Sequence, residues 1–235
     1  MKPVLLASAI LLGLAAAVPG QSNVDPVNKH AWGENVGWTN WRDAGDPPGD
    51  EGVNVGAFVM SGFAWGENIG FINLGDGSPT TPPHYANVDG TDFGVNIDPD
   101  GMLHGFAWGE NVGWINFDGG ALAVPAQPAR VDCADPPAMP LARLTGYAWG
   151  ENIGWINLDS LDATKFVALD AAGTPLDCDL NHDLAVNGLD IQFFVDLVMF
   201  GGASWADTCS GDLELIPDAM IDFDDVQPFV DCLIN

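Results

Sequence analysis

A regular set of oxygen-bearing side chains lies near the C-terminal end of the chain, in the stretch CDLNHDLAVNGLDIQFFVDLVM. If Asp179 is numbered position 1, the other side-chain donors fall at positions 3, 5, 9 and 12: Asn181, Asp183, Asn187 and Asp190. The main-chain carbonyl of Ala185 stands at position 7. Hard oxygen donors at this spacing wrap one Ca²⁺ in a twelve-residue loop. The sequence therefore predicts a Ca²⁺ site over residues 179–190.

A second segment repeats this pattern closer to the C-terminus. The text DIQFFVD at 190–196 recurs as DVQPFVD at 225–231. The second loop has acidic candidates for the same ligand positions: Asp212, Glu214, Asp218, Asp222 and Asp225. Because Ile221 matches Val186 at position 8, we expect the two loops to pair there. The sequence thus predicts two Ca²⁺ sites built on a duplicated unit.

The two loops differ in how well they fit the pattern. Loop two needs two extra residues between Glu214 and Asp218, whereas loop one keeps the regular spacing. Position 6 is Leu184 in loop one and Ala219 in loop two, although glycine is usual there. A left-handed conformation costs a residue other than glycine about 1–2 kcal/mol. We expect loop one to be the better Ca²⁺ site.

Each loop leads into an apolar segment that is predicted to be helical. Two inward faces follow from the helical period: Phe194, Val195 and Val198 on the first segment, and Phe229, Val230 and Leu233 on the second. Two loop-helix units without clear entering helices resemble a type I dockerin domain, over Cys178 to Asn235. This resemblance implies two bound Ca²⁺ and docking onto a cohesin-type partner, often to place polysaccharide-degrading proteins. The alternative is an acidic helical tail that binds no metal.

An aromatic phrase occurs four times in the preceding part of the chain. The copies are HAWGENVGWTNW (30–41), FAWGENIGFINL (63–74), FAWGENVGWINF (106–117) and YAWGENIGWINL (147–158). Aromatic and β-branched residues on both sides of a Gly-Glu-Asn turn indicate a β-hairpin. Alternating segments before the copies add a third strand, and the segment 165–176 resembles the strand that is missing before the first copy.

This periodicity indicates a repeat architecture. We expect a four-unit, Trp-rich β domain over residues 25–176, closed into a ring or barrel, with an open sandwich or a solenoid as alternatives. A small α-helical, dockerin-like domain at 177–235 should follow it. The phrase also resembles AW-x-x-N-[IV]-GW repeats of bacterial surface and secreted proteins.

The glutamates of the phrase are the first candidates for catalysis. They hold identical positions in the four copies: Glu34, Glu67, Glu110 and Glu151. A catalytic acid needs a partner and an environment that set its pKa, and four equivalent catalytic centres are not expected. We therefore interpret Glu and Asn as turn residues, and Trp and Ile as packing residues. In the alternative, exposed Trp rings stack on sugars while Glu and Asn hydrogen-bond the hydroxyls.

Composition and the N-terminal segment limit the classes of partner and the location of the protein. The chain has 33 Asp and Glu against 6 Lys and Arg, a formal charge of -27, which argues against nucleic acid or an anionic membrane as partner. A Lys followed by an apolar run from Val4 to Val18 indicates a signal peptide, residues 1–17, and this run is too short to span a membrane comfortably. We expect an exported protein, extracellular or at the cell surface, without a membrane span.

Export makes disulfides possible. Cys133, Cys178, Cys209 and Cys232 allow three connectivities, and at least one bond should lie in the C-terminal region. No G-x-S-x-G, H-E-x-x-H or P-loop motif occurs. The sequence predicts a non-catalytic, calcium-binding scaffold, adhesion or binding protein. The alternative is a carbohydrate-binding lectin, or a component of a polysaccharide-degrading enzyme, carried by a dockerin.

Overall fold

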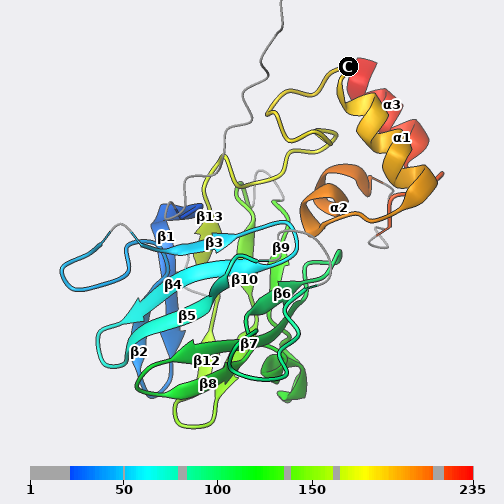
Figure 1. Ribbon diagram of the computed structural model, residues 1–235. Helices are drawn as coiled ribbons and strands as arrows, with labels where there is room; N and C mark the ends of the chain where they lie inside the picture. The colour runs from blue at the N-terminus through cyan, green and yellow to red at the C-terminus, as the bar shows by residue number, and fades with distance from the viewer. Residues whose placement is uncertain are drawn as a thin grey trace, which may run out of the picture.

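Strands dominate the structure, a computed structural model that describes residues 22–49, 51–78, 84–134, 139–160, 165–213 and 220–234. Within these ranges thirteen strands form one sheet, and three helices follow toward the C-terminus (Figure 1). The strands are β1 (Val24–Gly33), β2 (Gly37–Asn40), β3 (Val53–Val55), β4 (Met60–Gly66), β5 (Gly70–Asp76), β6 (Val95–Ile97), β7 (Leu103–Gly109), β8 (Gly113–Asn116), β9 (Arg130–Asp132), β10 (Arg143–Thr145), β11 (Tyr147–Gly150), β12 (Gly154–Asn157) and β13 (Val167–Leu169). The helices are α1 (Asp190–Phe200), α2 (Trp205–Gly211) and α3 (Val226–Ile234), and a 3-10 turn covers Gly119–Leu122.

The sequence predicts a signal peptide and no membrane span. The predicted signal peptide, residues 1–17, lies outside the described residues. Within the described ranges, no helix has both the length and the apolar character that a membrane crossing requires.

Eight of the strands close into an antiparallel barrel. Each aromatic phrase forms one hairpin of this barrel: β1–β2, β4–β5, β7–β8 and β11–β12. The hairpins follow one another around the barrel, and β12 pairs with β1 to close it. The phrases meet in one register at all four junctions: Asn40↔Trp65, Asn73↔Trp108, Asn116↔Trp149 and Asn157↔Trp32. The pairing of β12 with β1 confirms the prediction of a closed β arrangement. Closure leaves no unpaired edge among these eight strands.

Shorter strands extend the sheet beyond one end of the barrel. β3 pairs with β4, and β6 pairs with β7. β13, from the segment after the fourth phrase, pairs with β1 through Val24↔Leu169 and also with β10. The C-terminal strand of the β region therefore lies beside the N-terminal one.

The barrel interior is filled by the small and branched residues of the phrase. Each Ala of the first strand faces a larger residue of the second: Ala31↔Thr39, Ala64↔Ile72, Ala107↔Ile115 and Ala148↔Ile156. All eight are buried. Such alternation of small and large side chains fits the narrow interior of a small barrel. The next inward layer is Trp41, Leu74, Phe117 and Leu158, also buried.

The turns of the four hairpins are tied to one another in a closed ring of hydrogen bonds. The side-chain amide of each turn asparagine donates to a main-chain carbonyl in the turn of the adjacent hairpin: Asn35 to Ile153, Asn68 to Val36, Asn111 to Ile69, and Asn152 to Val112. These N···O distances are 3.0–3.1 Å. The glycine that ends each turn, such as Gly113, has a positive φ near +80°, which only glycine adopts without strain. The invariant Asn and Gly of the phrase thus have structural roles.

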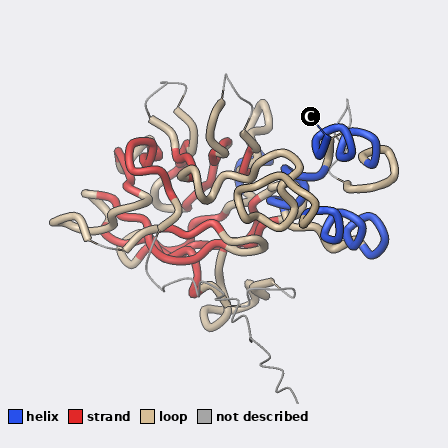
Figure 2. Tube along the Cα trace, turned by 90° about the horizontal axis from the view of Figure 1, so that it is seen from above, coloured by secondary structure: helices blue, strands red, loops and turns tan. Residues whose placement is uncertain are grey.

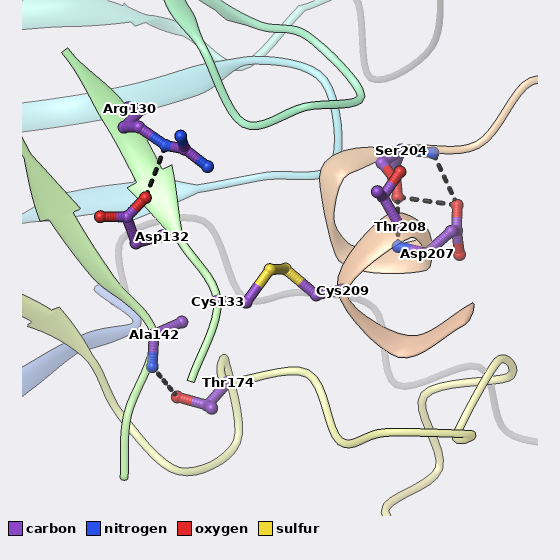
Figure 3. Close-up of a disulfide and its surroundings, with 9 residues drawn as sticks. All are labelled: Arg130, Asp132, Cys133, Ala142, Thr174, Ser204, Asp207, Thr208 and Cys209. Carbon is purple, nitrogen blue, oxygen red and sulfur yellow. Dashed lines mark hydrogen bonds and ion pairs between the residues drawn. A yellow bond between two sulfur atoms is a disulfide. The ribbon is translucent and has the colours of Figure 1, made fainter. Parts of the chain in front are cut away.

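The helices lie on one side of the strands, with α2 close to the barrel (Figures 1 and 2). Trp205 is buried against the barrel core, and its indole N–H donates to the carbonyl of Gly56 at 2.9 Å. A disulfide joins Cys133, after β9, to Cys209 of α2 (Figure 3). A second disulfide joins Cys178 to Cys232 within the C-terminal region, which confirms the expected bond there. The C-terminal region is therefore fixed to the barrel through α2.

The asparagine ring generates the first prediction. Asn111→Ala removes one interhairpin hydrogen bond and should lower the free energy of unfolding by about 1 kcal/mol, or the melting temperature by about 2–4 °C for a chain of this size. The adjacent Glu110→Gln is the matched control, because Glu110 is exposed in the same turn, and it should change the melting temperature little. Thermal unfolding followed by circular dichroism compares them. Equal effects of the two variants would contradict the assigned role.

A second prediction concerns His104 on the barrel surface. Its imidazole lies 2.6 Å from Asp118 through Nδ1 and 3.0 Å from Asp98 through Nε2. Partial burial opposes protonation, but the hydrogen bonds and charges of Asp118 and Asp98 outweigh it and raise the pKa of His104 above its ordinary value. A raised folded-state pKa gives stability that is complete below the unfolded pKa, about 6.5, and is lost as pH rises through the folded pKa.

Urea unfolding of the wild type and of His104→Gln tests this pH dependence. The wild type should be the more stable at about pH 5.5, where unfolded and folded histidine are both charged. Its advantage should shrink steadily toward about pH 8.5 as the imidazole loses its proton. A difference that stays constant over this range, or that grows with pH, would show that the ion pairs contribute nothing.

Candidate functional site

The predicted Ca²⁺ ligands of loop one lie in the segment that enters α1. Its two end carboxylates, Asp179 and Asp190, are 1% and 0% exposed. Asn181 and Asn187 are half-buried, whereas Asp183 is exposed. Ala185, the predicted carbonyl donor, is exposed as well. The loop therefore combines two buried carboxylates with a more open set of oxygen donors.

The buried carboxylates fold the loop by accepting main-chain amides. Asp179 accepts from Asp183 N at 3.2 Å and from Leu184 N at 2.8 Å, one bond on each oxygen. Asp190 accepts from Asn181 N at 3.2 Å and from Asn187 N at 2.8 Å, again one on each oxygen. A carboxylate offers about four acceptor positions. Each buried group therefore retains acceptor capacity.

Backbone strain is concentrated in the same loop. Leu184, at position 6, has φ +67°, and His182 has φ +53°. The left-handed conformation foreseen for position 6 is thus present in a residue with a Cβ. Such residues cost about 1–3 kcal/mol each and persist where the surroundings enforce them. Here the amide of Leu184 is held by Asp179.

The C-terminal region has many carboxylates and few cationic side chains of its own. Residues 178–235 contain no Lys or Arg, and their single histidine, His182, lies 2.9 Å from Asp207 of α2. Among the described residues, no Lys, Arg or His forms an ion pair with Asp179 or Asp190. A buried carboxylate is costly unless its charge is compensated.

Loop two repeats the geometry at its C-terminal end. Asp225 is 1% exposed and accepts from Leu213 N at 2.6 Å and from Asp222 N at 2.9 Å, as Asp190 does in loop one. Asp212 and Asp222 are also described. Glu214, Asp218 and Ala219 lie outside the described residues.

The two helices that leave the loops show the same duplication. Phe194 of α1 and Phe229 of α3 stack with ring centroids 4.1 Å apart and an interplanar angle of 4°. Gln192 donates to Asp196, and Gln227 to Asp231, both at 2.8 Å. These matched contacts place the repeated sequence on two equivalent helices.

Some expected packing in this region is wrong. Val186 is 40% exposed, whereas Ile221 is buried with Leu180 and the two stacked phenylalanines. Within the described residues, no β-bridge joins Val186 to Ile221. Val195 and Val230 are 44% and 41% exposed, because the stacked rings turn these neighbouring positions outward. Val198 and Leu233 pack against the small core as predicted.

Exposed apolar residues form a stripe on each helix at intervals of four residues. The stripe of α1 is Ile191, Val195 and Met199, and that of α3 is Val226, Val230 and Ile234. Their exposed fractions run from 39% to 74%. Residues at this interval share one helix face, so each helix presents an apolar face to solvent.

The donor types suit Ca²⁺, but they are not gathered at one point. All predicted ligands of loop one are oxygens, which Ca²⁺ prefers. Within the described residues, no three His, Cys, Asp or Glu side chains converge in a way that could hold a metal ion. The three aspartates of loop one, Asp179, Asp183 and Asp190, are thus not arranged as a three-carboxylate metal site.

The barrel places its aromatic residues on the outside, which corrects the packing expected for Trp. Six of them are 37–41% exposed: Trp32, Trp38, Phe71, Trp108, Trp114 and Trp149. Trp41 and Phe117, by contrast, are buried and contact each other. Since Ala precedes the first Trp of each phrase and faces inward, strand alternation turns that Trp outward. That alternation was available from the sequence.

The glutamates and the asparagines of the phrase differ in their surroundings. All four glutamates, Glu34, Glu67, Glu110 and Glu151, are exposed in the turns, as the turn interpretation requires. The asparagine ring that joins the hairpins was missed, because its hydrogen bonds reach residues 32 to 118 positions away in the chain.

Comparisons with known proteins gave no match to this chain, whether with protein-family models, curated proteins or solved structures.

Proposed function

We propose that the chain is an exported, non-catalytic binding protein whose C-terminal region, residues 177–235, folds around Ca²⁺ and docks onto a protein partner. The observation that carries this proposal is the burial of Asp179 and Asp190 in a region without Lys or Arg. A divalent cation would compensate both charges in a region whose one cationic candidate, His182, is paired with Asp207.

Loop one is the stronger site in this proposal. Its ligands are the side chains of Asp179, Asn181, Asp183, Asn187 and Asp190 and the carbonyl of Ala185. Hydrogen bonds from main-chain amides already hold both buried carboxylates at the ends of the loop, so Ca²⁺ binding needs only local movement of the exposed Asp183 and its neighbours. Loop two binds a second Ca²⁺ through Asp212, Glu214, Asp218, Asp222 and Asp225.

The apolar stripes on α1 and α3 support docking. Exposed apolar patches on a soluble protein mark interaction surfaces, and here two equivalent helices carry them. A cohesin-type partner fits the dockerin-like organisation of the region. The stripes lie on the helices that follow the two loops. Ordering of the loops by Ca²⁺ would therefore fix the positions of these helices and of the docking surface.

The barrel serves as a rigid carrier and display surface in this proposal. We infer that its four hairpins mark four units of one duplicated β element, each completed by a short extra strand. The four exposed glutamates occupy equivalent turns, which do not provide the distinct environments that an acid and a base require. This favours a binding role over the alternative of a polysaccharide-degrading enzyme.

Calcium binding is tested by calorimetry on the full chain. Ca²⁺ should bind and protect the segment after residue 178 from hydrogen exchange, and at 100 times Kd it should add about 2.7 kcal/mol to the stability of that region. Asp190→Asn should weaken Ca²⁺ binding because it removes a buried ligand charge. Asp196→Asn, an exposed aspartate of the same helix, is the matched control and should bind as the wild type does. Mg²⁺ should substitute poorly, since it resists dehydration.

Two results would overturn the calcium proposal. One is the absence of heat and of any exchange protection at millimolar Ca²⁺. The other is equal Ca²⁺ affinity of Asp190→Asn and the wild type.

Docking is tested by capture of secreted proteins of the source on the immobilised full chain, with Ca²⁺ and with EDTA. The double variant Val195→Asp, Val230→Asp places a charge in each stripe and should reduce capture by about tenfold or more, as expected for the centre of an interface. Val27→Asp is the control, because Val27 is an exposed apolar residue of the barrel. Capture that survives both stripe changes would show that the helices are not the docking surface.

A further inference from the structure

A cleft opens on the outer face of the barrel beside the third hairpin. Its volume is about 330 Å³, within the range of small-ligand pockets. It is lined by Asn87, Val88, Asp89, Gly90, Phe93, Phe106 and Trp114. Two strands of the hairpin form one side, and a loop from the segment between the second and third phrases forms the other.

Aromatic rings make the apolar wall of this cleft. Trp114 lies edge to face with Phe93, at a centroid distance of 5.2 Å, and with Phe106, at 6.0 Å. Trp108 also packs against Trp114, with the two ring centroids 4.7 Å apart. Trp114 is nevertheless 41% exposed. The neighbouring rings fix its orientation while leaving part of its surface open to a ligand.

The loop that faces the hairpin is held in place before any ligand arrives. The side chain of Asn87 accepts from Gly94 N at 3.1 Å and donates to Gly94 O at 3.0 Å. Its main-chain N–H donates to Asp92 O at 3.0 Å. Tyr85, at the base of the loop, is buried and donates to Met60 O of β4 at 3.1 Å. A preformed cleft avoids much of the ordering cost of binding.

The rim of the cleft is negative. The Oδ1 atom of Asp89 accepts from Thr91 N at 2.8 Å and from Thr91 Oγ1 at 2.6 Å, and these bonds lower the pKa of Asp89. The group is therefore ionised at neutral pH and accepts hydrogen bonds. The whole chain carries a formal charge of -27, so an anionic ligand meets unfavourable electrostatics here.

The first hairpin shows what an equivalent ring accepts. Trp38 occupies the position that matches Trp114, with similar exposure. Its ring is covered by the ammonium group of Lys165 at 4.7 Å, a cation–π contact. At the third hairpin the cleft leaves the ring of Trp114 open, and the facing loop supplies Asp89 in place of a lysine.

We propose that this cleft binds a pyranose unit of a polysaccharide that carries no acidic groups. The apolar face of the sugar packs on the ring of Trp114 between Phe93 and Phe106, and its hydroxyl or ammonium groups donate to Asp89. Charge complementarity excludes uronic and sulfated sugars. The cleft lies on the barrel and uses none of the proposed Ca²⁺ ligands, so binding is independent of the calcium proposal.

Titration calorimetry on the full chain tests the cleft with three tetrasaccharides: cellotetraose, the glucosamine tetramer and the galacturonate tetramer. The first two should bind, and they should bind equally in EDTA and in Ca²⁺. The galacturonate tetramer should give no heat at the same concentrations. Trp emission of the wild type should change on binding, because Trp114 lies in the contact.

Variants locate the binding. Trp114→Ala removes the platform and should weaken binding of cellotetraose by about tenfold, a difference of 1.4 kcal/mol. Phe93→Ala changes only the facing loop and should also weaken cellotetraose binding. Because it leaves the hairpin intact, its effect cannot come from a folding defect of the hairpin. Trp38→Ala is the matched control, with the same position in its hairpin, and should leave the affinity unchanged.

Four outcomes would overturn the proposal. The first is that neither cellotetraose nor the glucosamine tetramer binds, and the second is that the galacturonate tetramer binds as tightly as they do. The third is that Trp38→Ala weakens binding as much as Trp114→Ala does. Loss of binding in EDTA would also overturn it, since it would move the site to the Ca²⁺ loops.

Discussion

Closure of the barrel is the constraint on which the rest of the structure depends. Four hairpins meet at four junctions in one register, and the last strand pairs with the first. Once the register is fixed, strand alternation decides which residues face the core and which face solvent. A shift of one residue at any junction would turn the Ala and Ile positions outward and the Trp positions inward. The asparagine ring at the turns holds each hairpin to the next and so protects this register.

The aromatic exterior is a consequence of that closure. The interior of an eight-stranded barrel is narrow, and here it is filled by Ala, Ile, Val and Leu, with Trp41 and Phe117 in the inner layer next to them. Most tryptophans are therefore displaced to the surface, where they contact their hairpin partners edge to face. At the third hairpin an extra loop turns this surface into a cleft.

The C-terminal region is positioned by its contacts with the barrel and has a small core of its own. Trp205 and the Cys133–Cys209 disulfide anchor α2 to the barrel, and the Cys178–Cys232 disulfide ties the start of loop one to α3. The core of this region is small, being centred on Phe194 and Phe229. Such a core contributes little energy to oppose the repulsion between carboxylates, which is why a bound cation has so large a role in the proposed function.

The sequence by itself determined the local features of this protein. The four hairpins follow from aromatic and β-branched residues around Gly-containing turns, and the two loop-helix units follow from the repeated DIQFFVD and DVQPFVD text. The left-handed conformation of Leu184 followed from its loop position. These features rest on interactions between residues that are close in the chain, so a single sequence carries enough information to predict them.

Only the tertiary structure decided how the long-range contacts are made. The cysteines allowed three pairings, and folding of α2 onto the barrel selected Cys133 with Cys209. The outward position of Val195 and Val230 followed from the stacking of Phe194 on Phe229, which joins two helices separated by a loop. The ring formed by Asn35, Asn68, Asn111 and Asn152, and the placing of Phe93 against Trp114, depend on closure of the barrel, because closure brings together residues whose distance in the chain says nothing about their distance in space.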